Sequence, residues 1–259
     1  MKLNYVDIHS HLNLSPLSEN KEAVLVKMKE EGVGTITVGT GLETSREALK
    51  IAEENENCWA TVGIHPTDTD ELFDEQVFLE LAEHPKTVAI GETGLDYFRD
   101  QSENLKNKQV ELFKKHIELA MKINKPLMLH VRASKGSDDA YYDALDILKY
   151  ATVHANFHFF SGSKKCMQDI VAAGFTISVD GPITFSSDYD EMIKAVPLDK
   201  IMIETDAPFA APAPYRGKTC EPWMVIEIAK KIAELKGLDL EVVRTQVLNN
   251  TARFLNLDL

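Results

Sequence analysis

Cysteine is scarce in this sequence of 259 residues. The three cysteines, Cys58, Cys166 and Cys220, lie far apart, and none belongs to a Cys-x-x-Cys pair. Their number and spacing argue against a cysteine-based zinc site and against a framework of disulfide bonds. A sparse, odd-numbered set of cysteines is typical of a protein from a reducing compartment.

Long hydrophobic runs are also missing. Residues 1–5 contain no apolar signal core, and no stretch of the chain is long enough to span a bilayer. We therefore expect a soluble, cytoplasmic protein without a membrane partner, and a monomer is the favoured oligomeric state.

Basic residues are outnumbered, with 28 lysines and arginines against 41 aspartates and glutamates. The formal net charge is −13. Such a surface repels the phosphate backbone at long range, which excludes a protein that coats DNA through a general basic surface. An enzyme acting on nucleic acid is not excluded, because bound divalent cations reverse the sign of the field locally.

The chain does contain a regular alternation of short β-rich runs and longer helical patterns. The β-rich runs are apolar and often β-branched, as expected for strands covered on both faces. Eight strands, each followed by a helix, favour an α/β fold of the (β/α)8 TIM-barrel type over an open sheet. The predicted strands are residues 5–9, 35–39, 59–65, 87–92, 127–131, 155–160, 175–179 and 201–206. The predicted helices are residues 21–31, 44–54, 75–84, 104–123, 137–150, 164–172, 189–195, 221–236 and 240–254.

Length and composition fit this fold. A TIM barrel usually takes about 250 residues, and the 44% hydrophobic and 27% charged residues are ordinary for a globular protein. No linker, low-complexity tract or block of like charge divides the chain. We therefore expect one barrel domain over residues 1–259 instead of two small domains.

Polar residues fall at the C-terminal ends of the predicted strands, where a TIM barrel carries its active site. The first strand ends in Asp7-Ile8-His9-Ser10-His11. Alternate residues of a strand share a face, so His9 and His11 could hold one metal ion and Asp7 could orient a ligand. A polar turn on a surface strand would produce the same short pattern. Histidines or carboxylates recur at five further strand ends, at His65, Glu92, His130, His158 and Asp206.

Each of these residues has a structural explanation when taken singly, as a core histidine, a helix-capping glutamate or a loop aspartate. Five of the eight histidines lie at one end of the predicted barrel, which favours a metal site instead. His84, His116 and His154 are predicted in helices or at the start of a strand, at the opposite end. We interpret these three as structural or surface residues.

The motifs at the strand ends resemble, in order, those of the TatD family of metal-dependent deoxyribonucleases, within the wider amidohydrolase group. The resemblance covers nearly the whole chain, from Asp7 to Pro222. It implies a TIM barrel that holds two divalent metal ions and hydrolyses the phosphodiester bonds of DNA from the 3′ end. The matching segments are DIHSH (7–11), GIHP (63–66), GETGLDY (91–97), PLMLHVR (126–132), HFFSG (158–162), ETDAP (204–208) and RGK-x-x-EP (216–222).

The resemblance also implies how the two ions are held. Imidazole and carboxylate ligands suit Zn²⁺, Mn²⁺, Co²⁺ or Ni²⁺, whereas Mg²⁺ prefers more oxygen, so the choice among these five ions stays open. The implied ligands are His9, His11 and Asp206 for one ion, His130 and His158 for the other, and Glu92 as the bridge between them.

Four residues receive roles in the reaction. Asp206 could accept the proton of the attacking water while it ligates a metal, and Glu92 acts as the catalytic bridge. Arg132 can fork to a phosphate, although a salt bridge within the barrel is an equal alternative. His65 could donate a hydrogen bond to phosphate.

Other positions bear on substrate preference. The family often has a second histidine where this chain has Thr67, and asparagine where it has Cys220, and both positions could line the pocket. Tyr97 and Phe98 could stack on bases or pack at the barrel rim. The loop cations that could flank an acidic strand, or simply be solvated, are Lys164, Lys165, Arg216 and Lys218.

Residue chemistry alone supports metal-assisted hydrolysis, and DNA as the substrate comes from the resemblance. One alternative is a metallohydrolase of a small-molecule amide, lactone or phosphoester, which an apolar pocket would favour. A second alternative is a non-catalytic binding module, against which the complete set of six ligands argues.

Overall fold

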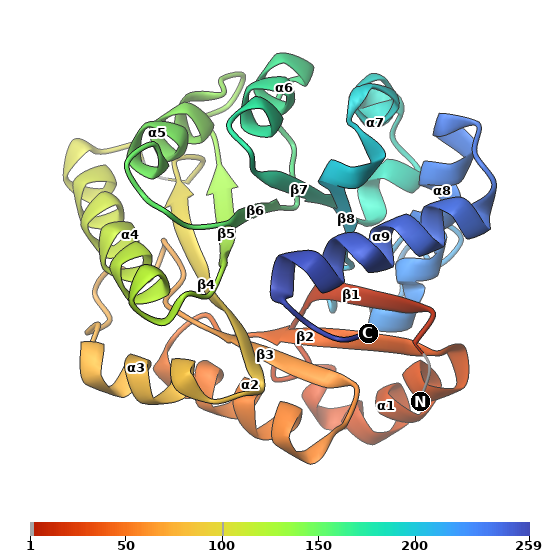
Figure 1. Cartoon of the computed structure of the whole chain (residues 1–259), viewed down its shortest axis with the longest axis horizontal. Helices are drawn as coiled ribbons and strands as arrows, with labels where there is room; N and C mark the ends of the chain where they lie inside the picture. Colours follow the sequence, from red (N-terminus) through yellow and green to blue (C-terminus); the bar gives the residue numbers. More distant parts are fainter. Residues whose placement is uncertain (1–2, 100) are drawn as a thin grey trace.

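Eight parallel strands follow one another around a barrel in the computed structural model, which describes residues 3–99 and 101–259 (Figure 1). Each strand pairs in parallel with the next one along the chain. The (β/α)8 barrel predicted from the sequence is confirmed. The strands are β1 (Tyr5–Ser10), β2 (Val33–Val38), β3 (Cys58–Val62), β4 (Thr87–Asp96), β5 (Leu127–Arg132), β6 (Ala155–His158), β7 (Thr176–Val179) and β8 (Ile201–Ile203).

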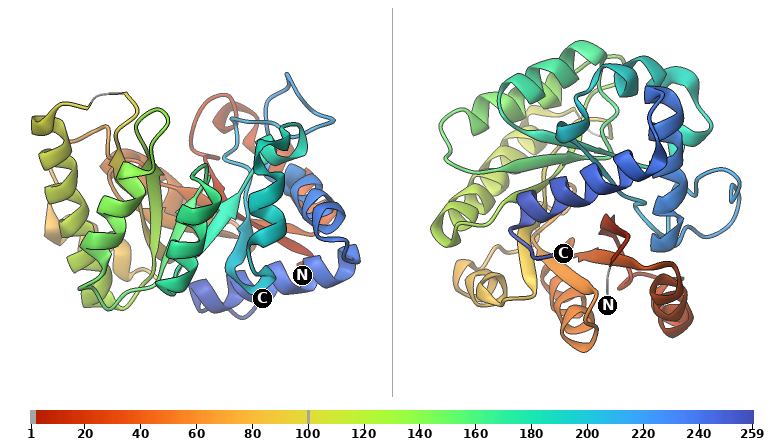
Figure 2. Two further views of the ribbon diagram at one scale, coloured as in Figure 1. Left: turned by 90° about the horizontal axis from the view of Figure 1, so that it is seen from above. Right: turned by 45° about the vertical axis from the view of Figure 1, so that its right-hand side comes forward.

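Helices connect the strands and cover the outside of the barrel (Figures 1 and 2). Asp74 begins α3 by accepting hydrogen bonds from the backbone N–H groups of Gln76 and Val77. Two helices, α1 and α8, end at Gly32 and Gly237, whose φ angles of +69° and +64° suit glycine. The helices are α1 (Lys21–Glu31), α2 (Leu42–Glu54), α3 (Glu75–Glu83), α4 (Glu103–Ile123), α5 (Asp139–Leu148), α6 (Lys164–Ala172), α7 (Asp190–Ala195), α8 (Val225–Lys236) and α9 (Leu240–Leu255).

The barrel closes where β8 approaches β1. An isolated parallel bridge joins Ser10 to Ala207, and the backbone N–H of Asp206 donates to the carbonyl of His9 at 2.9 Å. The carboxylate of Asp7 accepts hydrogen bonds from the backbone N–H and the hydroxyl of Thr205, at 2.9 and 2.6 Å. Asp7 therefore holds together the ends of the two strands that carry His9 and Asp206.

The N-terminal end of the barrel is filled with apolar side chains. Val6, Ile36 and Met202 belong to a buried cluster that also contains Leu255 from α9. This last helix crosses the end of the barrel and contacts β1 and β8 (Figure 1). The filled end leaves the C-terminal face as the place for a site.

Several element boundaries differ from the prediction, and three of the differences lie near the predicted site. Strand β4 continues to Asp96 instead of ending at residue 92, and β8 ends at Ile203 instead of residue 206. A 3₁₀ turn, Pro222–Met224, precedes α8, so the helix begins at Val225 instead of residue 221. Within the described part of the chain, no helix has the length and apolar character needed to cross a membrane.

Candidate metal centre

The predicted site residues converge on a cavity of about 620 Å³ at the C-terminal ends of the strands. His9 lies fully buried beside it, and the other seven line it. Most of the lining residues are polar or charged. The lining residues are His11, Leu14, Thr40, His65, Glu92, Asp96, Arg99, His130, Val131, Arg132, His158, Phe159, Ser161, Tyr189, Asp206, Phe209 and Ala210.

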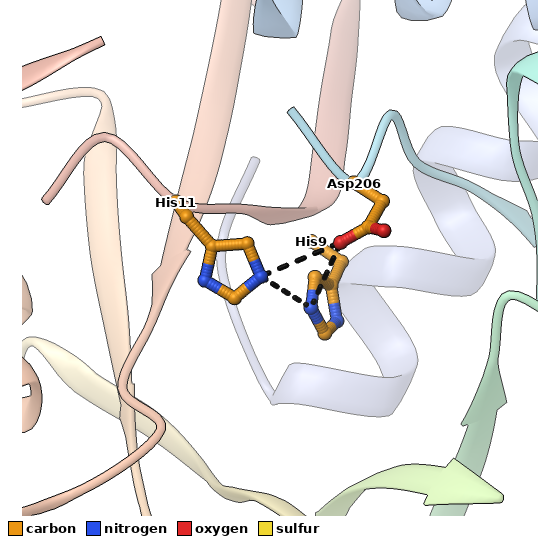
Figure 3. A group of neighbouring side chains, drawn as sticks. All are labelled: His9, His11 and Asp206. Carbon is orange, nitrogen blue, oxygen red and sulfur yellow. Dashed lines mark hydrogen bonds and ion pairs between the residues drawn. The ribbon is translucent and has the colours of Figure 1, made fainter. Parts of the chain in front are cut away.

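His9, His11 and Asp206 form the first group of potential ligands (Figure 3). The Nε2 atoms of the two histidines lie 3.3 Å apart. Asp206 Oδ1 lies 3.7 Å from His9 Nε2 and 3.4 Å from His11 Nε2. Four ligand atoms at about 2.1 Å from a tetrahedral ion lie roughly 3.4 Å from one another. The three side chains are therefore spaced and turned as ligands of a single ion would be.

Glu92 lies between this group and a second pair of imidazoles. Its Oε2 atom is 3.4 Å from His9 Nε2 and 3.9 Å from His11 Nε2. Its Oε1 atom is 2.8 Å from His130 Nδ1 and 2.9 Å from His158 Nε2. One carboxylate thus offers one oxygen to each imidazole pair, which is the arrangement a bridging ligand requires.

Both β1 and β4 are irregular where they present these ligands. The pairing of β1 with β2 shifts register between Asp7 and Ser10, and that of β4 with β5 shifts between Ile90 and Thr93. A shift of this kind redirects side chains locally. The carboxylate of Asp7 contacts His9 through the backbone, since it accepts a hydrogen bond from the His9 N–H at 3.2 Å, and it also binds Thr205. That Asp7 orients a ligand stays a prediction.

Two imidazoles have fixed acceptors on the side away from Glu92. His130 Nε2 lies 3.1 Å from a carboxylate oxygen of Asp96, and His11 Nδ1 lies 3.2 Å from the carbonyl of Val38. An acceptor of this kind fixes the tautomer and the direction of a metal-binding histidine. Asp96 belongs to the GETGLDY segment, yet the sequence alone assigned it no role.

Glu204 lies at ion-pair distance from His158, whose Nδ1 has no hydrogen-bond partner among the described residues. Its Oε1 lies 3.5 Å from His158 Nδ1 and accepts a hydrogen bond from the backbone N–H of Phe159. Its Oε2 accepts from the Ser178 hydroxyl at 2.6 Å, and that hydroxyl oxygen accepts from the Asn156 amide at 2.7 Å. Glu204 is fully buried, so these partners hold its carboxylate in one place. The signal for this role was its position two residues before Asp206.

Electrostatics favour ionised carboxylates in the cluster. Burial raises the pKa of Glu92, but the imidazoles of His158 and His9 outweigh burial and hold that pKa well below its ordinary value. Burial of Asp206 is likewise outweighed, first by its hydrogen bond with His11, so its pKa is lowered. Both groups are therefore carboxylates at neutral pH, the form that binds metal ions.

His65 lies directly beside Glu92 and His130, although phosphate binding does not require such a short distance to them. Its Nε2 is 3.6 Å from Glu92 Oε1, and it forms a further group of potential ligands with Glu92 and His130. Its Nδ1 lies 2.6 Å from the Thr67 hydroxyl. Thr67 thus contacts His65 without lining the cavity itself, and Cys220 is fully buried outside the cavity. Phosphate binding by His65 stays a prediction.

Arg132 is exposed at the cavity mouth, where its guanidinium stacks on the Phe98 ring at 3.9 Å. It forms no ion pair with any residue in 3–99 or 101–259, so the structure does not support the alternative of a barrel salt bridge. Tyr97 is buried and donates a hydrogen bond from its hydroxyl to Asp143 at 2.9 Å. Tyr97 therefore cannot stack on a base, whereas Phe98 can.

His116 lies in α4, in a helix as predicted, but its ring contacts the functional end of the barrel instead of the opposite end. Its Nε2 accepts a hydrogen bond at 2.9 Å from the backbone N–H of Ile64, directly before His65. Its Nδ1 donates to the carbonyl of Leu112 at 2.8 Å. His116 therefore joins α4 to the functional end of the barrel.

Four imidazoles and two carboxylates at the mouth of a (β/α)8 barrel define a metal-dependent hydrolase. The family model described as TatD related DNase matches residues 6–256. The chain therefore belongs to the TatD family.

Relatives support this placement. The metal-dependent hydrolase YabD of Bacillus subtilis is 36% identical, over 97% of this chain and 99% of its own length. A Shigella flexneri protein named 3′-5′ ssDNA/RNA exonuclease TatD is 30% identical, over 90% of this chain and 92% of its own length. The crystal structure of YJJV, a TatD homolog from Escherichia coli, covers both chains fully with a TM-score of 0.87 and 28% identity.

Proposed function

We propose that the protein hydrolyses phosphodiester bonds of DNA, one nucleotide at a time from the 3′ end. The observation that carries the proposal is the position of Glu92, with one oxygen toward each imidazole pair. The cavity beside it has Arg132 at its mouth, and this arginine forms no ion pair with a carboxylate in the part of the chain that the structure describes. The name of the Shigella relative supports a nucleic-acid substrate.

The donor set fits two divalent ions. His9, His11 and Asp206 would hold one, His130 and His158 would hold the other, and Glu92 would be shared by both. Such a pair of ions supplies a hydroxide nucleophile at neutral pH and offsets phosphoryl charge.

The side chains of the cavity perform the remaining tasks. The Asp206 carboxylate accepts the proton of the attacking water, since it is ionised and faces the ligand cluster. Arg132 donates in-plane N–H groups to the phosphate oxygens. Below the predicted ligands, apolar side chains fill the barrel interior, so a DNA strand cannot pass through it. This supports hydrolysis at the end of a DNA strand.

A nuclease assay with metal titration tests the proposal. We expect linear single-stranded DNA with a 5′ label to shorten stepwise, and circular single-stranded DNA to resist. Duplex and abasic DNA in the same assay give the strand preference. Rapid cutting of the circle would mean endonuclease action. Inactivity on every DNA with metal bound would refute the proposal and favour a small-molecule substrate.

A further inference from the structure

Two pairs of an arginine stacked on a phenylalanine lie on the rim around the cavity. Arg132, the last residue of β5, stacks at 3.9 Å on Phe98, which lies just beyond the end of β4. Arg216 stacks on Phe185 at 3.5 Å, beyond the ends of β8 and β7 and three strands further round the barrel. The two phenylalanines remain 47% and 44% exposed, so a planar group can still reach each ring.

Neither arginine forms an ion pair within the described residues, although the protein carries a net charge of −13. Arg46 and Arg244, by contrast, each pair with a glutamate on their own helix. Stacking orients a guanidinium while its in-plane N–H groups stay free to fork to a phosphate. Both rim pairs therefore offer an aromatic face beside an available anion-binding group.

The Phe185–Arg216 pair sits on two loops that are fixed to each other. The backbone N–H of Ala213 donates to the Thr184 hydroxyl at 2.8 Å, and that hydroxyl donates to the carbonyl of Gly181 at 2.7 Å. A Cβ atom at Gly181 would lie 1.7 Å from the carbonyl oxygen of Ala210, so only glycine permits this approach. The pair is thus held in place before any substrate arrives.

The same two loops supply Tyr189, Phe209 and Ala210 to the cavity, whereas Phe185 and Arg216 lie outside it. A small molecule that fills the cavity would not engage the outer pair. A polymer whose end occupies the cavity would have to leave across the rim. The position of the Phe185–Arg216 pair suits a nucleotide further along the polymer, away from the end that occupies the cavity.

We propose that Phe185 and Arg216 form a remote subsite for single-stranded nucleic acid. A base several nucleotides from the scissile end stacks on Phe185, and a neighbouring phosphate binds Arg216. The inference rests on the proposed hydrolysis of phosphodiesters, and it adds a dependence on strand length. Arg132 and Phe98 bind the nucleotides nearest the cavity, and this binding does not depend on the length of the nucleic-acid strand.

The test compares kcat/KM for a single strand of about eight nucleotides with kcat/KM for a dinucleotide. The ratio of the two values measures what the remote subsite contributes. The variants are Phe185→Ala and Arg216→Met. The matched controls are Tyr150→Ala and Lys149→Met, an exposed cation–aromatic pair between α5 and β6, at the other end of the barrel. Fluorescence anisotropy with a labelled strand in chelator measures binding independently of cleavage.

We expect the length ratio of each rim variant to fall by roughly fivefold to a hundredfold, as for the loss of one stacked base. The control variants should keep the wild-type ratio. A wild-type ratio near one, or rim variants that keep the full ratio, would overturn the inference and leave the hydrolytic function standing. If the wild type cleaves neither substrate, the proposed function fails, and anisotropy decides the subsite. Weaker binding by the rim variants supports it, and equal binding refutes it.

Discussion

The two ends of the barrel share the same eight strands but differ in what their side chains do. At the N-terminal end, Met202 and its neighbours pack against Leu255 of α9. At the C-terminal end, the buried carboxylate of Glu92 lies among imidazoles, of which His9, His11 and His158 are buried and His130 is partly exposed. Apolar burial stabilises the fold, whereas buried charge costs free energy unless it is paired. The comparison predicts that stability and catalysis can be changed separately.

Metal removal should have the largest effect on activity, and it should act only at the C-terminal end of the barrel. The purified protein is expected to carry or take up to two divalent ions per chain. Chelation should abolish hydrolysis, and metal addition should restore it. Elemental analysis beside the assay is the measurement, and full activity in metal-free protein would contradict the assignment of the site.

Asp206→Asn should come next, with a rate loss of roughly 10²–10⁴-fold, the range for losing a general base. Asp206 has a φ of +54°, a conformation that asparagine also tolerates, so the backbone should not be strained by the change. Single-turnover kinetics with thermal melting and metal analysis is the measurement. A near-normal rate in the folded, metal-bound variant would remove Asp206 from catalysis without affecting the barrel.

The sequence was sufficient for the number and order of the strands and for placing the predicted ligands at one end of the barrel. Both are local features, since an apolar run predicts a strand and its last polar residue points to the site. The register shifts beside His9 and Glu92 could not be predicted, because a register depends on how two strands pair. The partners of Glu204 were missed, and the choice between stacking and packing for Tyr97 stayed open, for the same reason, since both depend on contacts across the barrel.

Leu255→Ala tests the N-terminal end of the barrel, where we expect a loss of stability without a loss of catalysis. Leu255 is 4% exposed and closes the apolar cluster. Its truncation should lower the free energy of unfolding by roughly 2–3 kcal/mol. The rate per folded molecule should stay near that of the wild type. Chemical denaturation and steady-state kinetics at low temperature are the measurements, and a large loss of kcat without loss of stability would show that the two ends are coupled.

Glu204→Gln tests whether a buried charge at the functional end supports metal binding or only packing. Glutamine keeps the size of the side chain but removes the charge beside His158 Nδ1, 3.5 Å away. We expect a 10- to 100-fold loss in metal affinity or activity, as for other groups that orient a ligand. Metal titration gives the affinity. Excess metal should recover part of the activity, and an unchanged titration would mean that Glu204 acts only in packing.

The prediction for His116 concerns stability alone, and it tests whether a residue that contacts the functional end also stabilises the fold. Its Nε2 accepts the N–H of Ile64, so this nitrogen must stay unprotonated in the folded protein. Burial lowers the pKa of His116 from 6.5 to about 4. Between these two values, only the unfolded chain takes up the proton as the pH falls. The contribution of His116 to the free energy of unfolding is therefore fully present above about pH 6.5. It declines on acidification, by at most about 1.4 kcal/mol per pH unit.

Chemical denaturation of the wild type and of His116→Gln, at several pH values from 7 to 4.5, measures this pH dependence. The glutamine amide can replace both hydrogen bonds but has no proton to take up, so the variant should lose less stability in acid. Parallel curves for the two proteins would show that His116 does not carry this linkage.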